Sequence, residues 1–220
     1  MIRLENLTKV FDLGRRSKVV ADNINAEFPT GRAVGLLGRN GAGKSTLLSM
    51  IAGTILPTSG RIVSSGTISW PVGFAGSFHP ELTGLQNTRF IARIYGVDTD
   101  ELATFVEDFS GLGPHFRQPL RTYSAGMKSR LAFGVSMGIG FDTYLVDEIT
   151  AVGDAAFRER STEVFRERMK RSGVVMVSHS VAQVRQLCTA GAVLENGQLA
   201  YYDDIDDAIA HHQRNMREAV

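Results

Sequence analysis

The segment Gly38–Ser45 fits the pattern of a phosphate-binding loop, Gly-x-x-x-x-Gly-Lys-Ser. It follows a β-type run at 33–37 and opens a helical pattern from Lys44 to about Ala52. Glycines let the backbone curl until successive N–H groups point at phosphate oxygens, and the helix start adds partial positive charge there. The pattern and its strand–helix context predict a nucleotide site.

The side chains that follow the loop's glycines have expected partners on the nucleotide. Lys44 would reach the β and γ phosphates, Ser45 would ligate Mg²⁺, and Thr46 would contact the nearer phosphates. A glycine-rich turn without a ligand is the alternative, and the full pattern argues against it. The predicted nucleotide-binding residues here are Gly38, Arg39, Asn40, Gly41, Ala42, Gly43, Lys44, Ser45 and Thr46.

Two adjacent acids, Asp147 and Glu148, end the apolar run Tyr144–Val146, which is typical of a buried strand. Sheets of the α/β class bind ligands at the carboxyl ends of their strands. Neighbouring side chains on an extended segment point to opposite sides, so we expect two roles. Asp147 suits the Mg²⁺ shell, and Glu148 suits a general base for the attacking water. The alternative is an acidic strand end in solvent.

A histidine, His179, follows the next apolar run at 174–177, from which an imidazole could contact the γ phosphate. Taken alone, it would be a hydrogen-bonded structural histidine. The other histidines, His79, His115, His211 and His212, are expected on loops or at the surface.

The composition limits the classes of protein that are possible. A chain of 220 residues, 43% of them apolar, can bury the core of one domain. Its net charge of +1 argues against nonspecific nucleic-acid binding. The single cysteine, Cys188, cannot form an internal disulfide and is expected to be packed. No secretory signal begins the sequence, and the longest weakly polar stretch is well short of the ~20 residues of a membrane helix. We therefore expect a cytoplasmic protein that attaches to a membrane only through a partner.

The alternation of β-type and helical runs favours an α/β fold with a mostly parallel, doubly wound sheet. A helical subdomain of about 80–140 is expected between the strands. We expect strands at 2–7, 18–28, 33–37, 61–63, 67–72, 144–146, 174–177, 192–194 and 198–202, and helices at 44–52, 84–95, 101–109, 124–137, 154–171 and from 203 onward.

A second phosphate-type turn, Ser124–Met127, lies between the phosphate loop and the acidic pair. With Ala151–Asp154 and His179 in the same order, the motifs resemble those of ABC ATPases, whose signature reads Leu-Ser-Gly-Gly-Gln. The resemblance covers nearly the whole chain. It implies a P-loop NTPase nucleotide-binding domain with an N-terminal antiparallel β subdomain, ATP and Mg²⁺ as ligands, and a head-to-tail homodimer.

The resemblance also implies roles for individual residues. Ser124 and Gly126 would touch the γ phosphate held by the opposite subunit, and Asp154 would contact that subunit. Phe11 would stack on the adenine. Lys44, Glu148 and the switch histidine His179 would form the catalytic group, with Ser45 and Asp147 as the metal ligands.

The chain departs from the family pattern at two places. Ala125 and Met127 replace a glycine and the glutamine of the signature. The loop 72–80 lacks the glutamine that usually links Mg²⁺ to the transmembrane partner, and Gln86 comes too late, on the following helix. Coupling would then rely on backbone, Ser77 or water.

The segments 70–84 and 147–154 resemble ATPases of polysaccharide exporters, closest to the ATP-binding subunit of bacterial capsular-polysaccharide export. This implies a permease subunit in the inner membrane, a wider envelope export complex and a place at the cytoplasmic face. The short tail after 202 favours this type over O-antigen exporters that carry a carbohydrate-binding domain. Export of O-antigen or teichoic acid remains an alternative, as does a soluble ABC ATPase of the cluster-assembly type. A kinase with only a phosphate loop would leave Ser124–Met127 unexplained.

Overall fold

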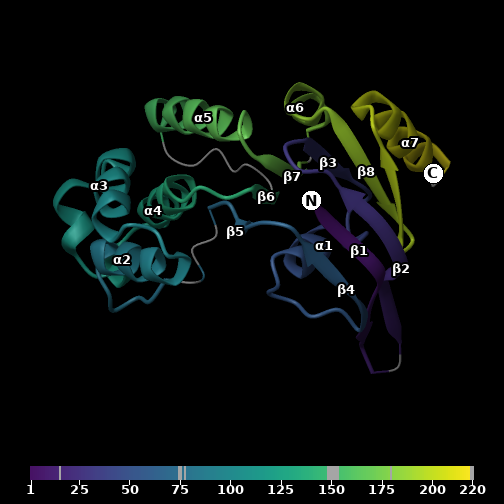
Figure 1. Ribbon diagram of the computed structural model, residues 1–220, viewed down its shortest axis with the longest axis horizontal. Helices are drawn as coiled ribbons and strands as arrows, with labels where there is room; N and C mark the ends of the chain where they lie inside the picture. Colours follow the sequence, from purple (N-terminus) through teal and green to yellow (C-terminus); the bar gives the residue numbers. More distant parts are fainter. Residues whose placement is uncertain (15, 74–75, 77, 148–153, 179, 219–220) are drawn as a thin grey trace. The chain divides into compact units, whose positions relative to one another are not determined.

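The computed structural model describes residues 1–14, 16–73, 76, 78–147, 154–178 and 180–218. Contacts divide the chain into two compact units (Figure 1). The first unit comprises Met1–Pro71, Phe141–Ile149 and Met169–Val220, and the second comprises Val72–Gly140 and Thr150–Arg168.

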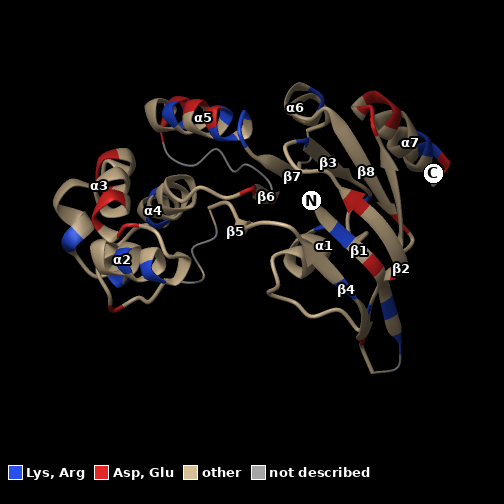
Figure 2. Cartoon of the chain, in the orientation of Figure 1, with Lys and Arg blue, Asp and Glu red and all other residues tan. Residues whose placement is uncertain are grey.

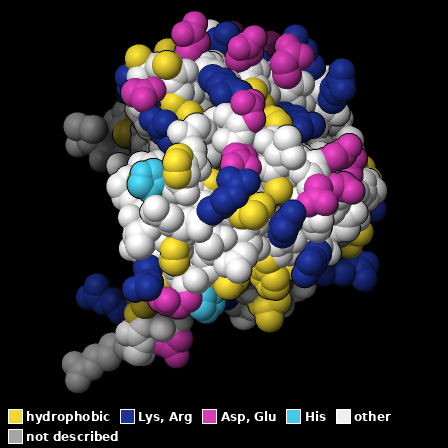
Figure 3. Space-filling view, turned by 90° about the vertical axis from the view of Figure 1, so that its left-hand side faces the viewer, with side chains coloured by type: hydrophobic (Ala, Val, Ile, Leu, Met, Phe, Trp, Pro, Cys, Tyr) yellow, Lys and Arg dark blue, Asp and Glu magenta, His cyan; other side chains and the backbone are white. Residues whose placement is uncertain are grey.

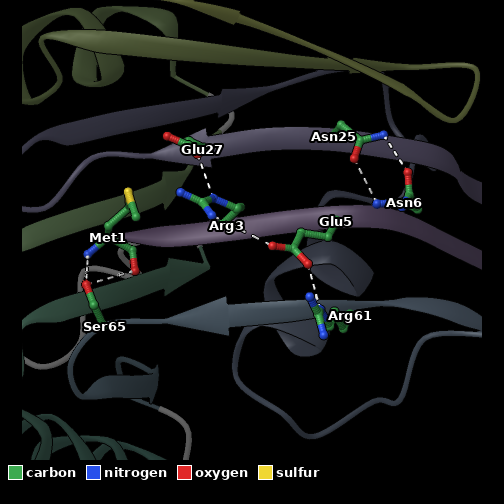
Figure 4. Close-up of polar contacts among 8 residues, drawn as sticks. All are labelled: Met1, Arg3, Glu5, Asn6, Asn25, Glu27, Arg61 and Ser65. Carbon is green, nitrogen blue, oxygen red and sulfur yellow. Dashed lines mark hydrogen bonds and ion pairs between the residues drawn. The ribbon is translucent and has the colours of Figure 1, made fainter.

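The first unit begins with a three-stranded antiparallel sheet in the order β2-β1-β4. Its strands are β1 (Ile2–Asp12), β2 (Ser17–Phe28) and β4 (Ser59–Ser64). Cross-strand ion pairs line one region of it (Figure 4): Arg3 Nε lies 2.6 Å from Glu27 Oε1, and Arg61 Nε lies 2.6 Å from Glu5 Oε2. Each pair joins residues directly opposite in the register, so the charges reinforce the predicted antiparallel pairing.

The second sheet has six strands in the order β5-β6-β7-β3-β8-β9, all parallel except β9. Its central strands are continuous apolar runs because both of their faces are covered. At the β8–β9 hairpin, Asn196 (φ 47°) and Gly197 (φ 79°) form the predicted tight turn. The strands are β3 (Ala33–Leu37), β5 (Ile68–Pro71), β6 (Thr143–Asp147), β7 (Gly173–Val177), β8 (Ala190–Glu195) and β9 (Gln198–Tyr202).

Helix α1 (Lys44–Ile51) contributes Leu47 and Leu48 to a core that also takes side chains from both sheets of the first unit. Helix α7 (Ile205–Glu218) packs on β3 and β8, and α6 (Val181–Leu187) contacts α7 and, through Val184, lies beside Gly35 of β3 (Figure 1). Gly35 permits this close packing, since a Cβ there would lie 2.4 Å from Val184 Cγ1. The mostly parallel second sheet with its helices, together with the antiparallel first sheet, confirms the predicted α/β class.

In its described residues, the second unit contains four helices and two short 3₁₀ turns. An aromatic cluster, Phe105, Phe109, Phe133 and Phe157, joins three of the helices, with ring centroids of neighbouring members 5.3–6.5 Å apart. The helices are α2 (Gly84–Tyr95), α3 (Thr99–Ser110), α4 (Ala125–Gly138) and α5 (Ala155–Met169), and the turns are Gly113–Arg117 and Leu120–Thr122. Helix α5 carries charges of both signs (Figure 2), and Phe157 is its anchor in the cluster.

Charges of both signs are also interspersed on the face drawn in Figure 3. This mixture agrees with the net charge of +1. Among the described residues, none of the helices has the length and apolar character needed to cross a bilayer.

Candidate functional site

The predicted phosphate loop connects the end of β3 to the start of α1. Its glycines take left-handed backbone angles, with φ of 152° at Gly38, 80° at Gly41 and 105° at Gly43. Gly43 is the residue directly before the helix. The loop therefore curls as the glycine pattern predicts, and it ends at a helix N-terminus of the kind that favours anions.

Neighbouring strands leave no room for side chains at two of these glycines. A Cβ at Gly38 would lie 2.4 Å from the carbonyl oxygen of Leu194 in β8. One at Gly43 would lie 2.1 Å from Cγ1 of Val20 in β2. The shape of the loop is thus imposed from both sheets of the first unit.

The side chain of Lys44 folds back over this loop. Its Nζ donates to the carbonyl oxygens of Gly38 at 2.7 Å and Arg39 at 2.9 Å. Burial lowers the pKa of Lys44, while the charges of Asp147 and Glu195 act in the opposite direction. The ammonium group is held at the loop with two carboxylates within electrostatic reach, so it can meet phosphate oxygens without a large rearrangement.

The oxygen ligands proposed for Mg²⁺ lie on two elements of the first unit. Asp147 ends β6 and is half-buried, and Ser45 is exposed in the first turn of α1. Among the described residues, no group of three His, Cys, Asp or Glu could hold a metal ion by itself. One hydroxyl and one carboxylate suit Mg²⁺, which takes most of its remaining ligands from water and substrate phosphates. The donor set therefore fits the ion.

The predicted base Glu148 and the switch histidine His179 lie outside the described residues, as do Ala151, Val152 and Gly153. Their roles stay predictions. Ser178, which directly precedes His179, is described: its Oγ donates to Gln183 Oε1 at 2.7 Å and accepts from the N–H of Ser180 at 3.1 Å.

A cavity of ≈ 360 Å³ lies beside the phosphate loop. Its lining includes Leu37, Gly38, Arg39, Asn40, Lys44, Ser178, Val181, His212 and Met216. The cavity is thus lined by the predicted loop residues and also by residues after β7 and on α6 and α7, which were not predicted from the sequence as site residues.

The expectation that His211 and His212 are loop or surface residues is wrong. Both lie on α7 and are half-buried. The sequence carried a signal for this, because His212 follows the buried Ile205 by seven residues and the buried Ala208 by four, which places it on the same helix face.

The proposed adenine-stacking residue, Phe11, lies half-buried near the end of β1. The ammonium of Lys9 lies 4.8 Å from the centre of its ring, a cation–π contact. Its register partner on β2 is Lys18, whose Nζ lies 3.9 Å from the point a Gly41 Cβ would occupy. The strand pair therefore brings the region of Phe11 to the phosphate loop.

The signature turn lies in the second unit. Ser124 is the N-cap of α4, and its Oγ accepts from the N–H of Met127 at 3.2 Å. Ser124 and Gly126 are exposed, and a Cβ at Gly126 would meet only Ser124 Oγ, at 3.9 Å. No contact in the described part of the chain requires a glycine at position 126.

Asp154 is linked to the signature helix. Arg130 of α4 donates from Nη2 to Asp154 Oδ2 at 2.7 Å, and the N–H of Phe157 donates to Oδ1 at 2.9 Å. These bonds, that from Phe157 first, lower the pKa of the Asp154 carboxyl. The guanidinium of Arg130 also lies over the Phe157 ring, 4.9 Å from its centre.

Gln86 lies on α2, as expected. With Thr83 it forms a capping box: Thr83 Oγ1 accepts from the N–H of Gln86 at 3.1 Å, and Gln86 Oε1 accepts from the N–H of Thr83 at 2.9 Å. Its side chain is thus used in starting the helix. Of the preceding glutamine-free loop, Phe74, Ala75 and Ser77 lie outside the described residues.

Comparison with known proteins gives consistent results. A family model described as ABC transporter matches residues 21–151. The polysialic acid transport ATP-binding protein KpsT of Escherichia coli is 46% identical over 97% of this chain and 96% of its own length. The capsule polysaccharide export ATP-binding protein CtrD of Neisseria meningitidis is 43% identical over 96% of this chain and 98% of its own.

The fold has matches among solved structures. A dimeric post-hydrolysis state of the ATP-binding cassette MJ0796, bound to ADP and Pi, superimposes with a TM-score of 0.76 at 21% identity, covering 93% of this chain and 99% of the other. At this identity the likeness concerns the fold alone. Together with the family match and the relatives of nearly equal length, it leads to one conclusion: this chain belongs to the ABC transporter family.

Proposed function

We propose that this chain is the ATP-hydrolysing subunit of an exporter that moves a lipid-linked capsular polysaccharide across the inner membrane. The observation that carries the ATPase part is the phosphate loop, whose glycine conformations and bound Lys44 side chain form a cradle for phosphates. The polymer is inferred from KpsT and CtrD, whose names state polysialic acid transport and capsule export.

The residues of the first unit would act on the substrate ATP as follows. Backbone N–H groups of the loop and the Lys44 ammonium hold the phosphates, and Phe11 stacks on the adenine. Ser45 and Asp147 would hold Mg²⁺, which when bound neutralises charge on the phosphate oxygens. Glu148 takes the proton of the attacking water.

Ser124 and Gly126 complete the site of a second copy in a head-to-tail dimer. This is supported by their exposure and by the open space at Gly126, which no need of its own chain explains. Closing the dimer on ATP would move a permease subunit in the inner membrane. The chain itself would lie at the cytoplasmic face, within a wider envelope export complex.

The proposal is tested by replacing the base and the phosphate-binding cation separately. Glu148→Gln should lower ATP hydrolysis by about 10²–10⁴-fold while ATP binding persists, because the amide cannot take a proton. Lys44→Ala should lose ATP binding itself. Hydrolysis is followed by phosphate release and binding by calorimetry, on purified protein with its permease in lipid vesicles. Near-normal turnover of Glu148→Gln would remove Glu148 from this role.

The polymer needs its own experiment. Cells whose chromosomal copy carries Glu148→Gln should accumulate lipid-linked capsular polymer in the cytoplasm and show none at the surface. Accumulation of O-antigen or teichoic acid precursor instead would assign the alternative exporter. Co-purification with soluble scaffold proteins and with no membrane subunit would favour the cluster-assembly class.

A further inference from the structure

The end of α7 lies beside the phosphate loop because of how the chain enters this helix. Arg32, directly before β3, donates from Nη1 to Asp203 Oδ1 at 2.6 Å, just ahead of α7. The helix therefore starts at the amino end of β3, and its packing against that strand carries it toward the carboxyl end. There His212 and Met216, one turn apart, line the cavity that also contains the loop residues.

The two neighbouring histidines of α7 differ in their hydrogen bonds. His211 has partners for both ring nitrogens: Nδ1 lies 2.9 Å from Tyr202 Oη and Nε2 lies 3.3 Å from Asn215 Nδ2. In His212, by contrast, Nδ1 is buried and has no hydrogen-bond partner among the described residues. A buried polar atom of this kind calls for a ligand or water to satisfy it.

The charges around His212 favour its neutral form. Burial lowers the pKa of His212, the ammonium of Lys44 and the ring of His211 lower it further, and the Glu195 carboxylate opposes them. A neutral imidazole has one N–H to donate and remains compatible with the nearby ammonium.

The rest of the cavity wall indicates which chemistry would supply the missing partner. Four residues of the phosphate loop, Gly38, Arg39, Asn40 and Lys44, line the cavity, and Lys44 is a cation. Backbone N–H groups at a helix start, together with an ammonium, select an oxyanion. A tetrahedral phosphate can accept from these donors and still offer an oxygen to the imidazole of His212, which lines the same cavity.

We propose that His212 is a further phosphate-binding residue of this site: it donates an imidazole N–H to the terminal phosphate of the nucleotide and to the inorganic phosphate that hydrolysis leaves. The C-terminal helix then takes part directly in holding and releasing phosphate. This inference rests on the proposed ATPase function.

The test measures inorganic phosphate binding to the full chain loaded with ADP and Mg²⁺, by calorimetry. His212→Leu, similar in size but without a donor, should weaken phosphate binding by about tenfold and change ADP affinity less than twofold, because a hydrogen bond to a charged group is lost. His212→Gln should recover part of the affinity through its amide N–H. His211→Ala is the matched control and should bind phosphate as the wild type does.

Equal phosphate affinity in wild type and His212→Leu would overturn the proposal, as would a wild type that takes up no phosphate at millimolar concentration. Parallel losses of ADP and phosphate in His211→Ala and His212→Leu would also overturn it, because they would show that α7 acts only through packing. A chain that binds ADP and phosphate but never hydrolyses ATP would refute the proposed function, while the same titration would still decide the role of His212.

Discussion

The phosphate loop and the signature turn both depend on glycine, but for different reasons. At Gly43 the backbone has a φ of 105° and a Cβ would lie 2.1 Å from Val20. Gly126 lies in a regular helix, and a Cβ there would come no closer than 3.9 Å to Ser124 Oγ. The fold of the chain itself requires the first glycine and tolerates the loss of the second.

This difference separates structural need from functional need. When contacts within the chain require a residue type, as at Gly43, the motif gives information on the local fold. When no contact within the chain requires it, as at Gly126, the residue type is better explained by binding to another molecule. The shape of the phosphate loop is therefore determined by one chain alone. The signature turn fits a surface that binds a second copy of the chain, as the proposed head-to-tail dimer requires.

The largest expected effect on stability is at Gly43. Gly43→Ala should lower the free energy of unfolding by about 3 kcal/mol, since it adds a left-handed alanine and a clash in a packed region. Thermal unfolding without nucleotide should show a melting temperature lower by roughly 6–12 °C for a chain of this size. The double variant Val20→Ala/Gly43→Ala should recover the part that comes from the clash. An unchanged melting temperature would mean that the loop can take another shape.

The next expected effect is at Gly126, where a substitution should lower ATP hydrolysis without lowering stability. Gly126→Asp should fold as well as the wild type or better, because an acid in the first turn of α4 interacts favourably with the helix dipole. Its ATP hydrolysis should nevertheless fall at least about tenfold, since the carboxylate would face the γ phosphate of the other copy. Gly126→Ala is the control for size alone. A loss of stability comparable to that of Gly43→Ala would contradict the comparison.

Mixing two inactive variants makes this test sharper. If sites are shared head to tail, a dimer of one Lys44→Ala chain and one Gly126→Asp chain keeps one intact site. Random pairing should then restore up to roughly a quarter of the wild-type sites. If each chain hydrolysed ATP alone, the mixture would stay inactive. Activity is measured after the chains are mixed and compared with each variant by itself.

The sequence predicted the parts of the fold that local patterns determine. Continuous apolar runs located β3 and β7, and polar–apolar spacing with a period of about 3.6 residues located α2. Helix α6 was missed because it has only seven residues and a single buried one, Val184, too few for a helical period to emerge. Sequence order also located the phosphate loop, because its residues are consecutive.

Long-range neighbours of the site could not be predicted in this way. The pair Arg130–Asp154 joins α4 to the residue directly before α5, and its existence depends on how α4 and α5 pack through their phenylalanines. His212 reaches the phosphate loop only because α7 returns along β3. The periodicity of α7 could place His212 on the buried side of the helix, but not beside Lys44.

The smallest expected effect is on stability and concerns the ion pair between Asp154 and Arg130 of the signature helix α4. Because the folded pKa of Asp154 is lowered, its contribution to stability is present above the carboxyl's unfolded pKa and is lost as pH falls through the folded pKa. Asp154→Asn keeps an acceptor for the N–H of Phe157 but loses the charge that attracts Arg130. The melting temperatures of wild type and Asp154→Asn should therefore differ slightly near pH 7 and converge as the pH falls from about 4 through the lowered pKa of Asp154. The phosphate loop, which backbone geometry enforces, should show no such convergence when Gly43→Ala is compared with wild type over the same range. A difference for Asp154→Asn that stays constant down to pH 2 would show that the ion pair with Arg130 contributes nothing, and that the N–H of Phe157 alone holds this side chain.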